Sequence, residues 1–226
     1  MNVLLDLDGT LTDPREGIVA CLRHALCSIG IQPPEDRELE RFIGPPLQES
    51  LALLLDPRNK QQVGKAIALY RERFLTKGMF ENAVYPGIRE ALHHLRDRGA
   101  TLYVATSKPQ VFAERTIEHF GLGGLFRSVH GSELDGTRSN KAELIAHLLN
   151  AESLTREATV MVGDRSHDVA GAMANGVCPI GALWGYGSRE ELTAAGAKVL
   201  CEHPSMLVDA VPFDPGLQST PAIGRG

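Results

Sequence analysis

The sequence predicts an α/β protein, built as a doubly wound parallel sheet with an inserted all-helical segment. After residue 84, short apolar runs without polar alternation are separated by helix-length segments, as in strands that are buried on both faces of a parallel sheet. The first apolar run, residues 3–5, ends abruptly in the carboxylates of Asp6 and Asp8. Residues 14–82 show apolar side chains at helical spacing and no convincing strand, so we expect a helical insert within one core.

Bulk composition limits the class of protein. The 226 residues are enough for one large domain or for a core with a smaller insert. Hydrophobic residues make up 43% of the chain and charged residues 23%, which is ordinary for a globular protein. A net charge of −5 without a Lys/Arg-rich block argues against a nucleic-acid polymer as partner.

The sequence also gives an expectation about location. It has no apolar run of membrane-spanning length, and its N-terminal residues lack a basic segment followed by a cleavage site. The cysteines show no CxxC spacing, which indicates neither a zinc site nor a disulfide framework; they are Cys21, Cys27, Cys178 and Cys201. We therefore expect reduced thiols in a cytoplasmic protein that does not engage a membrane.

Local signals divide residues 14–82, the predicted cap, into helices. Capping residues mark helix starts, glycines mark helix ends, and a pair of prolines breaks the chain between two short helices. The starts are Asp13–Pro14 and Asn59, the ends are Gly30, Gly44 and Gly78, and the prolines are Pro45 and Pro46.

The remaining residues, 1–13 and 83–211, are predicted to form the α/β core. Its further strands are short apolar runs at residues 100–105, 127–130, 159–162 and 177–181. Helix-length segments that close with glycines connect these runs, which makes the predicted sheet doubly wound. The last residues, 212–226, are rich in Pro, Gly and Ser and are predicted to form a mobile tail.

Polar and charged side chains follow the predicted strands at their C-terminal ends. Right-handed crossovers bring these ends to one edge of a parallel sheet, where open α/β sheets bind ligands. The side chains at this edge are Asp6, Asp8, Thr106 and Asp164, and Lys141 opens a helix nearby. We expect these five groups to lie close together.

The pair of Asp6 and Asp8 indicates the chemistry of this edge. Side chains two apart on a strand point the same way, and two such carboxylates repel unless one is protonated or a cation lies between them. Gly9 allows a sharp turn that brings backbone N–H groups near an anion. A cation and an anion at a carboxylate nucleophile suggest phosphoryl transfer. The alternative is a polar strand–turn junction without chemistry.

Four motifs, in this order, resemble those of the haloacid dehalogenase-like (HAD-like) hydrolase superfamily, and the resemblance spans residues 2–209. The motifs are Asp6-Leu7-Asp8-Gly9-Thr10, Thr106, Lys141 and Gly163-Asp164 with Asp168. The insert after the first motif resembles the C1 helical cap of the phosphoglycolate phosphatase and 5′-nucleotidase-like branch, which implies a HAD-like Rossmannoid core. The third motif departs from the commoner Lys-Pro pattern, since Asn140 precedes Lys141 and Ala142 follows it.

The resemblance implies roles for the acidic residues. Asp6 is expected to be the nucleophile that forms an aspartyl-phosphate, while Asp8 acts as acid on the leaving group and then as base on water. Mg²⁺ is the implied cofactor, held by carboxylates of Asp6 and Asp164 and by the backbone carbonyl of Asp8. Asp168 is expected to bind the metal directly, to bind it through water, or to orient Lys141.

Two further groups of residues are implied to contact the substrate. The phosphate is expected to bind Gly9, Thr106, Ser107 and Lys141. The leaving group is expected to be selected by Arg41, Gly44, Pro45 and Lys108. For each cation the alternative is a solvated surface position, and for the Gly-Pro turn it is a simple connection between helices.

The leading interpretation is a Mg²⁺-dependent phosphatase that hydrolyses a small phosphomonoester, similar to phosphoglycolate phosphatases. A 5′-nucleotidase acting on nucleoside monophosphates and a phosphomutase are alternatives within the same resemblance. A non-catalytic phosphate-binding or receiver-type sensor protein is disfavoured, because a large insert follows the nucleophile and both Asp6 and Asp8 are present. The sequence predicts neither the particular phosphorylated metabolite nor the oligomeric state.

Overall fold

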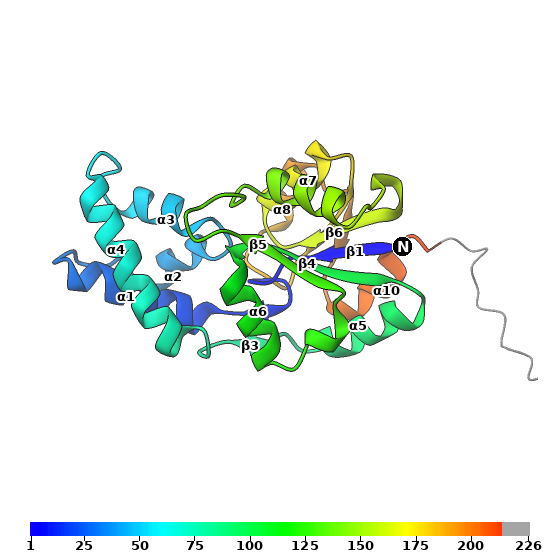
Figure 1. The fold of residues 1–226 in the computed structure, drawn as a ribbon, viewed down its shortest axis with the longest axis horizontal. Coiled ribbons are helices and arrows are strands. Elements are labelled where there is room, and N and C mark those ends of the chain that lie inside the picture. The colour runs from blue at the N-terminus through cyan, green and yellow to red at the C-terminus, as the bar shows by residue number, and fades with distance from the viewer. Residues whose placement is uncertain (214–226) are drawn as a thin grey trace, which may run out of the picture.

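A six-stranded parallel sheet forms the centre of the protein (Figure 1), and its strand order is β5-β4-β1-β6-β7-β8 in residues 1–213, the part of the chain that this computed structural model describes. The strands are β1 (Asn2–Leu5), β4 (Thr101–Pro109), β5 (Ser128–Ser132), β6 (Thr159–Gly163), β7 (Cys178–Ala182) and β8 (Val199–Cys201). The predicted α/β doubly wound fold is confirmed. The predicted mobile tail lies outside the described residues, except for positions 212 and 213.

Strand β1 lies in the middle of the sheet, parallel to β4 on one side and to β6 on the other. Its apolar residues point alternately to two hydrophobic clusters: Val3 and Leu5 pack with residues of α5, α6 and α10, whereas Leu4 packs with residues of α7 and α8. These helices are α5 (Ile88–Asp97), α6 (Gln110–His119), α7 (Lys141–Ala151), α8 (Ser166–Ala174) and α10 (Leu207–Ala210). Burial on both faces explains the unbroken apolar run at the start of the sequence.

Between the first and second strands of the main sheet, the chain leaves the core for a group of helices (Figure 1). The two connections pair as a small antiparallel sheet of β2 (Thr12–Asp13) and β3 (Ala83–Val84). The helical elements are α1 (Arg15–Ser28), α2 (Asp36–Leu39), η1 (Glu40–Phe42), α3 (Leu47–Leu54), α4 (Lys60–Arg73) and the π-helical turn η2 (Phe74–Gly78). We call residues 14–82 the insert. Most of its buried apolar residues form one cluster, which also includes Phe112 of α6 in the core. The status of the insert as a separate cap domain stays a prediction.

Several element boundaries differ from the prediction. Strand β4 runs to Pro109, beyond the predicted end at residue 105, because Pro109 pairs with Ser132 of β5 after an irregularity in register. Strand β8 was not predicted, since its three residues carry no periodic signal. The first insert helix begins at Arg15 rather than at Pro14, and Asp13 accepts a hydrogen bond from its backbone N–H.

The remaining helical elements lie in the core. They are α9 (Arg189–Ala195), η3 (Gly123–Leu125), η4 (Arg156–Ala158) and η5 (Pro204–Met206). Within residues 1–213, no helix combines the length and the apolar character that crossing a bilayer requires.

Candidate active site

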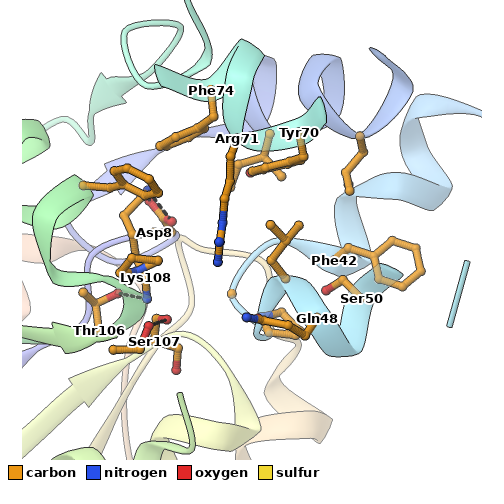
Figure 2. Close-up of a pocket in the computed structure, with 18 of the residues that line it drawn as sticks. Asp8, Phe42, Gln48, Ser50, Tyr70, Arg71, Phe74, Thr106, Ser107 and Lys108 are labelled. Carbon is orange, nitrogen blue, oxygen red and sulfur yellow. Dashed lines mark hydrogen bonds and ion pairs between the residues drawn. The ribbon is translucent and has the colours of Figure 1, made fainter. Parts of the chain in front are cut away.

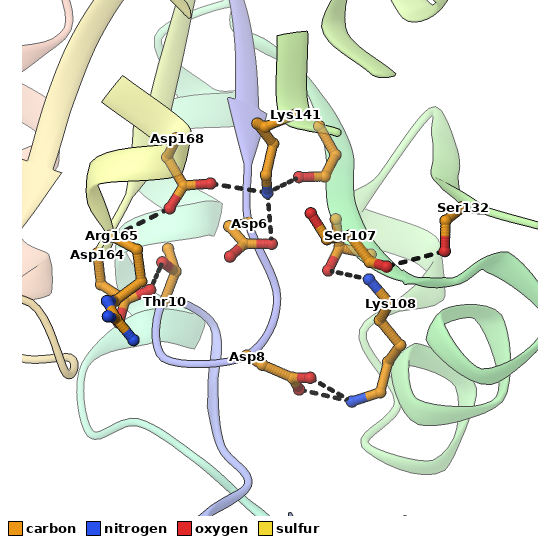
Figure 3. Close-up of polar contacts among 12 residues, drawn as sticks. Asp6, Asp8, Thr10, Ser107, Lys108, Ser132, Lys141, Asp164, Arg165 and Asp168 are labelled. Carbon is orange, nitrogen blue, oxygen red and sulfur yellow. Dashed lines mark hydrogen bonds and ion pairs between the residues drawn. The ribbon is translucent and has the colours of Figure 1, made fainter. Parts of the chain in front are cut away.

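Three aspartates form a buried cluster at the C-terminal edge of the sheet (Figure 3). Asp6 follows β1, Asp164 follows β6, and Asp168 lies in the first turn of α8. Each offers a carboxylate oxygen, and these three oxygens lie within 4.8 Å of one another. The parallel topology therefore assembles three carboxylates that are far apart in the sequence.

Asp164 is held in place by the turn after β1 and by the loop after β7. Its Oδ1 accepts a hydrogen bond from the Thr10 hydroxyl (3.2 Å), and its Oδ2 accepts one from the Tyr186 backbone N–H (2.8 Å). Gly9 has a φ of +90°, and a β-carbon on it would lie 2.3 Å from Asp164 Oδ2. The same holds for Gly185, whose β-carbon would lie 2.5 Å from that oxygen. Glycine at these positions leaves the room that the carboxylate occupies.

The structure gives Gly9 a different place from the predicted phosphate contact. Its N–H donates to the carbonyl of Thr12 at 2.8 Å, within the turn that follows β1. A donor that completes a tight turn is not directed at a ligand, so we no longer assign phosphate binding to this N–H. What Gly9 contributes in this structure is space beside Asp164.

Lys141 lies between two members of the cluster. Its Nζ is 3.0 Å from Asp6 Oδ1 and 2.7 Å from Asp168 Oδ1, and it donates to the carbonyl of Ala105 at 2.9 Å. Lys141 is the first residue of α7, whose N-cap is the side chain of Asn140. Asn140, the residue before Lys141 in which the sequence differs from the family's commoner third motif, therefore caps this helix. Lys141 still lies beside Asp6 and Asp168.

Asp168 contacts Lys141 and also accepts a hydrogen bond at the start of its own helix. Its Oδ2 accepts a hydrogen bond from the Arg165 backbone N–H at 3.1 Å, while its Oδ1 faces Lys141. This contact is compatible with one of the three predicted roles for Asp168, the orientation of Lys141, and that role stays a prediction. A direct or water-mediated metal contact of Asp168 stays a prediction.

The electrostatics of the cluster call for additional positive charge. Burial raises the pKa of Asp164 well above its usual range, and the charges of Asp168 and Asp6 add to this shift. Burial also raises the pKa of Asp168, to about 6, although Lys141 opposes the rise. Burial lowers the pKa of Lys141, but the charges of Asp168 and Asp6 outweigh it and leave this pKa raised. One lysine thus faces three buried carboxylates.

The cluster fits a hard divalent cation. In the part of the chain that the structure describes, Asp6 Oδ1 and Asp168 Oδ1 are buried oxygens that accept no hydrogen bond, although both lie at ion-pair distance from Lys141. All three residues offer carboxylate oxygens, which are the donors that Mg²⁺ and Ca²⁺ take in proteins. A cation bound there would give these oxygens a second positive partner besides Lys141.

Asp8 is separate from the three-aspartate cluster. Its two carboxylate oxygens both lie 2.6 Å from Lys108 Nζ, and both side chains are buried. Burial raises the pKa of Asp8, and the nearby ammonium of Lys108 opposes this rise. Lys108 Nζ also lies 5.1 Å from the ring centroid of Phe74, which belongs to the insert. Lys108 therefore contacts Asp8 of the core and an aromatic ring of the insert.

A cavity extends from Asp6 and Asp8 to the insert (Figure 2). From the core it is lined by Asp6, Asp8, Thr106, Ser107, Lys108, Pro109, Phe112, Ser132 and Glu133, and from the insert by Ile18, Leu22, Phe42, Gly44, Pro45, Leu47, Gln48, Ser50, Tyr70, Arg71 and Phe74. The nucleophile expected from the sequence thus opens into a space covered by apolar and aromatic side chains. This arrangement keeps bulk water away from the carboxylates.

Most of the predicted substrate-contacting residues line this cavity. Thr106 is buried there, and Ser107 is held by a hydrogen bond from the Ser132 hydroxyl to its carbonyl (2.8 Å). Arg41 is not among the lining residues: its side chain is exposed and its guanidinium carbon lies 4.7 Å from the ring centroid of Phe42. The predicted role of Arg41 in leaving-group selection is therefore not supported by its position.

Arg71 and Gln48 are lining residues that sequence reasoning missed. Arg71 lies in the last turn of α4, next to Tyr70 on the face that packs into the insert cluster. A faint signal exists in the sequence, because an arginine flanks the apolar stripe that includes Tyr70 and Phe74. Helical spacing alone does not tell such an arginine from a solvated one.

The fold and the site together define a class of protein: doubly wound α/β proteins with an aspartate at the end of a central strand, beside a carboxylate cluster and a lysine. The chain belongs to the haloacid dehalogenase-like hydrolase family, whose family model matches residues 3–182. The resemblance identified from the motifs is confirmed.

Similar proteins carry several names. The chain is 50% identical over 193 residues to a protein of Pseudomonas aeruginosa named 5′-nucleotidase. The match covers 85% of this chain and 87% of that protein. It is 39% identical over 198 residues to a Mycobacterium tuberculosis protein named tyrosine-protein kinase PtkA. The match covers 88% of this chain and 67% of that protein. It is 26% identical over 213 residues to a protein of Pseudomonas putida named phosphoglycolate phosphatase. The match covers 92% of this chain and 75% of that protein.

A solved structure agrees with these relatives. The crystal structure of a predicted phosphatase from Clostridium acetobutylicum matches with a TM-score of 0.88 and 41% identity, covering 92% of this chain and 96% of that one. The family, the similarity to proteins named as phosphatases and the assembled site together identify the protein as a phosphatase of the HAD-like family. Its substrate is then a small phosphorylated compound.

Proposed function

We propose that the protein is a Mg²⁺-dependent phosphatase that hydrolyses its substrate through an aspartyl-phosphate on Asp6. The observation that carries this proposal is the position of Asp6, buried beside Asp164, Asp168 and Lys141 on the floor of a covered cavity. A carboxylate is a weak nucleophile, so its reaction with a phosphate ester requires nearby positive charge. The three-aspartate cluster is the part of the site suited to hold that charge as a metal ion.

The residues have distinct parts in the proposed reaction. A carboxylate oxygen of Asp6 attacks phosphorus, and the P–O bond to the leaving group breaks as the leaving oxygen takes a proton from Asp8. Water then attacks the phosphorus of the aspartyl-phosphate and gives a proton to Asp8, while the bond between phosphorus and the Asp6 oxygen breaks. This step releases inorganic phosphate and restores the Asp6 carboxylate and the protonated Asp8. Bound by Asp6, Asp164 and Asp168, Mg²⁺ would supply neutralisation of phosphoryl charge.

The groups around the phosphate are proposed to orient and neutralise it. Lys141 lies within ion-pair distance of Asp6, so its ammonium is placed to offset the charge of a phosphoryl group bonded to that carboxylate. Thr106 lines the same end of the cavity, where its hydroxyl is available to a phosphate oxygen. Ser107 follows it in the extended end of β4.

We propose nucleoside 5′-monophosphates as the substrate class. The aromatic and aliphatic lining of the cavity offers apolar surface to a planar leaving group such as a nucleobase. The relative named 5′-nucleotidase, at 50% identity, supports the same choice. Phosphoglycolate is the second candidate, because a cavity arginine suits its carboxylate and relatives carry that name.

The test is phosphate release from inosine, adenosine and uridine 5′-monophosphates, phosphoglycolate and phenyl phosphate, each with Mg²⁺ and after treatment with a chelator. We expect activity that requires Mg²⁺ and is highest on a nucleotide. Full activity in chelator would contradict the metal dependence. A clear preference for phosphoglycolate over every nucleotide would contradict the substrate class and leave the phosphatase mechanism standing.

A further inference from the structure

Arg71 is the cavity-lining charge for which the described residues provide no counter-charge. The carboxylates that line the cavity each have a cation at ion-pair distance: Asp6 has Lys141, Asp8 has Lys108, and Glu133 has Arg138. Arg71 lines the same cavity and makes no ion pair within residues 1–213. Arg73, two residues later on the same helix, does have a counter-charge, because its two Nη atoms donate to the Glu81 carboxylate at 2.7 and 3.0 Å.

The hydrogen bonds of Arg71 leave donors free. Its Nη2 donates to the carbonyl of Leu134 in the core at 2.6 Å. Its Nε is buried and has no hydrogen-bond partner in the described part of the chain. Figure 2 shows the side chain extending from α4 into the cavity, with its guanidinium on the side of Gln48 and Lys108. A buried N–H without an acceptor is unfavourable unless a ligand supplies one.

Gln48 lines the cavity beside Arg71 and has an unused amide. It belongs to α3, and its side chain makes no hydrogen bond to other described residues. Two insert hydroxyls also belong to this lining. Ser50 donates to the carbonyl of Pro46 at 3.2 Å, whereas the Tyr70 hydroxyl makes no hydrogen bond to other described residues. Arg71, Gln48 and the Tyr70 hydroxyl therefore remain available to a ligand in the cavity, and of these Arg71 is the one that carries a charge.

We propose that Arg71, with Gln48 beside it, binds the carbonyl edge of the nucleobase in the leaving group and so favours oxo-bases over adenine. This inference rests on the nucleotide substrate proposed above. A guanidinium offers parallel N–H donors and no acceptor, which matches the O6 and N7 acceptors of a 6-oxopurine. Adenine presents an amino donor in place of O6, so the same arginine meets a donor there. The aromatic rings of Phe42, Phe74 and Phe112 supply apolar contact to the base.

Inosine and adenosine 5′-monophosphates provide a matched pair of substrates, because they differ in the base edge and share the ribose and phosphate. We expect the wild-type protein to have a kcat/KM at least about tenfold higher for the inosine nucleotide, as is typical when a polar site loses its partner. In Arg71→Met this ratio is expected to fall to about one, chiefly through loss of the inosine activity. Gln48→Leu is expected to lower the ratio partly.

Arg73→Met is the control, because Arg73 lies on the same helix, is bound to Glu81 and does not line the cavity. This variant should keep the wild-type ratio. Inhibition by the product inosine gives a second readout, and its inhibition constant should rise about tenfold or more in Arg71→Met. That measurement and Gln48→Leu decide the question if Arg71→Met is too unstable for kinetics.

Three results would overturn the inference. A wild-type ratio near one would show that the base edge is not read, and an equal loss on both nucleotides in Arg71→Met would mean that Arg71 acts only through its contact with Leu134. Phosphate release from phenyl phosphate but from neither nucleotide would remove the substrate class and this inference together. The first two results leave the proposed nucleotide phosphatase intact, so the two failures are distinguishable.

Discussion

At the scale of single residues, Asp6 decides whether the site is catalytic. Asp6→Asn is nearly isosteric but removes the proposed nucleophile and one charge of the metal cluster. We expect turnover to fall by several powers of ten, while the thermal transition stays cooperative. Asp97→Asn, at an exposed position on α5, is a suitable control. Turnover of Asp6→Asn within about tenfold of the wild type would rule out the covalent mechanism.

The buried carboxylates predict how stability depends on pH without metal. The pKa of Asp168 is raised by burial to about 6, against about 3.9 in an unfolded chain. Between these values the folded protein binds more protons than the unfolded one, so the free energy of unfolding falls as pH rises. The Tm of the metal-free protein should therefore decrease from about pH 4.5 to about pH 7.

Mg²⁺ should reverse this loss, because it binds the ionised carboxylates of the folded state. We expect a larger rise of Tm on adding Mg²⁺ at about pH 7.5 than at about pH 5. Because an asparagine at position 168 does not ionise, the Tm of metal-free Asp168→Asn should depend less on pH than that of the wild type. A Tm increment from Mg²⁺ that is equal at both pH values would contradict the assignment of the cluster.

At the scale of elements, Arg165 connects the loop after β6 to the insert. Its Nη1 donates to the carbonyl of Ile43 at 2.6 Å and to that of Arg41 at 3.3 Å, and its Nε is 3.0 Å from Glu191 Oε1. A β-carbon on Gly44 would lie 3.0 Å from the Arg165 side chain, so glycine at that position, with a φ of +102°, allows the close approach. Arg165 thus holds the turn that covers the cavity.

Arg165→Met should loosen this cover and admit water to the reaction. We expect kcat/KM to fall roughly tenfold on phenyl phosphate and on nucleotides alike, since the contact involves the insert backbone and not the leaving group. This pattern differs from the change in ratio expected for Arg71→Met. Arg189→Met, which removes an exposed partner of Glu202, serves as control. Unchanged kcat/KM on both substrates would show that this contact does not limit catalysis.

Local signals allowed some elements to be predicted and left others out. Asn59 caps its helix as expected, because capping depends on residues within one turn. The extension of β4 to Pro109 depends on pairing with β5, and β8 is too short to show a period, so neither is readable from its own residues. Arg41 and Arg71 illustrate the same limit for function: both lie on insert helices, and only packing decides which one reaches the cavity.

At the scale of the whole molecule, topology explains why much of the aspartate cluster was predictable. Parallel strands joined by right-handed crossovers bring their C-terminal ends to one edge, so Asp6 and Asp164 meet whatever the loops between them contain. The cavity is different, because half of its lining comes from the insert. How the insert sits on the core depends on contacts such as Arg165 with Ile43, which no spacing in the sequence encodes.

The small sheet of β2 and β3 gathers both chain crossings between core and insert at one place, with Thr12 opposite Val84 and Asp13 opposite Ala83. The connections between the strands of the main sheet therefore stay the same when residues 14–82 change. An exchange of the whole insert between relatives would therefore keep the catalytic edge and replace the lining that meets the leaving group. We therefore expect that changes within the insert can alter the leaving group that the protein accepts while Asp6, Asp164 and Asp168 stay in place.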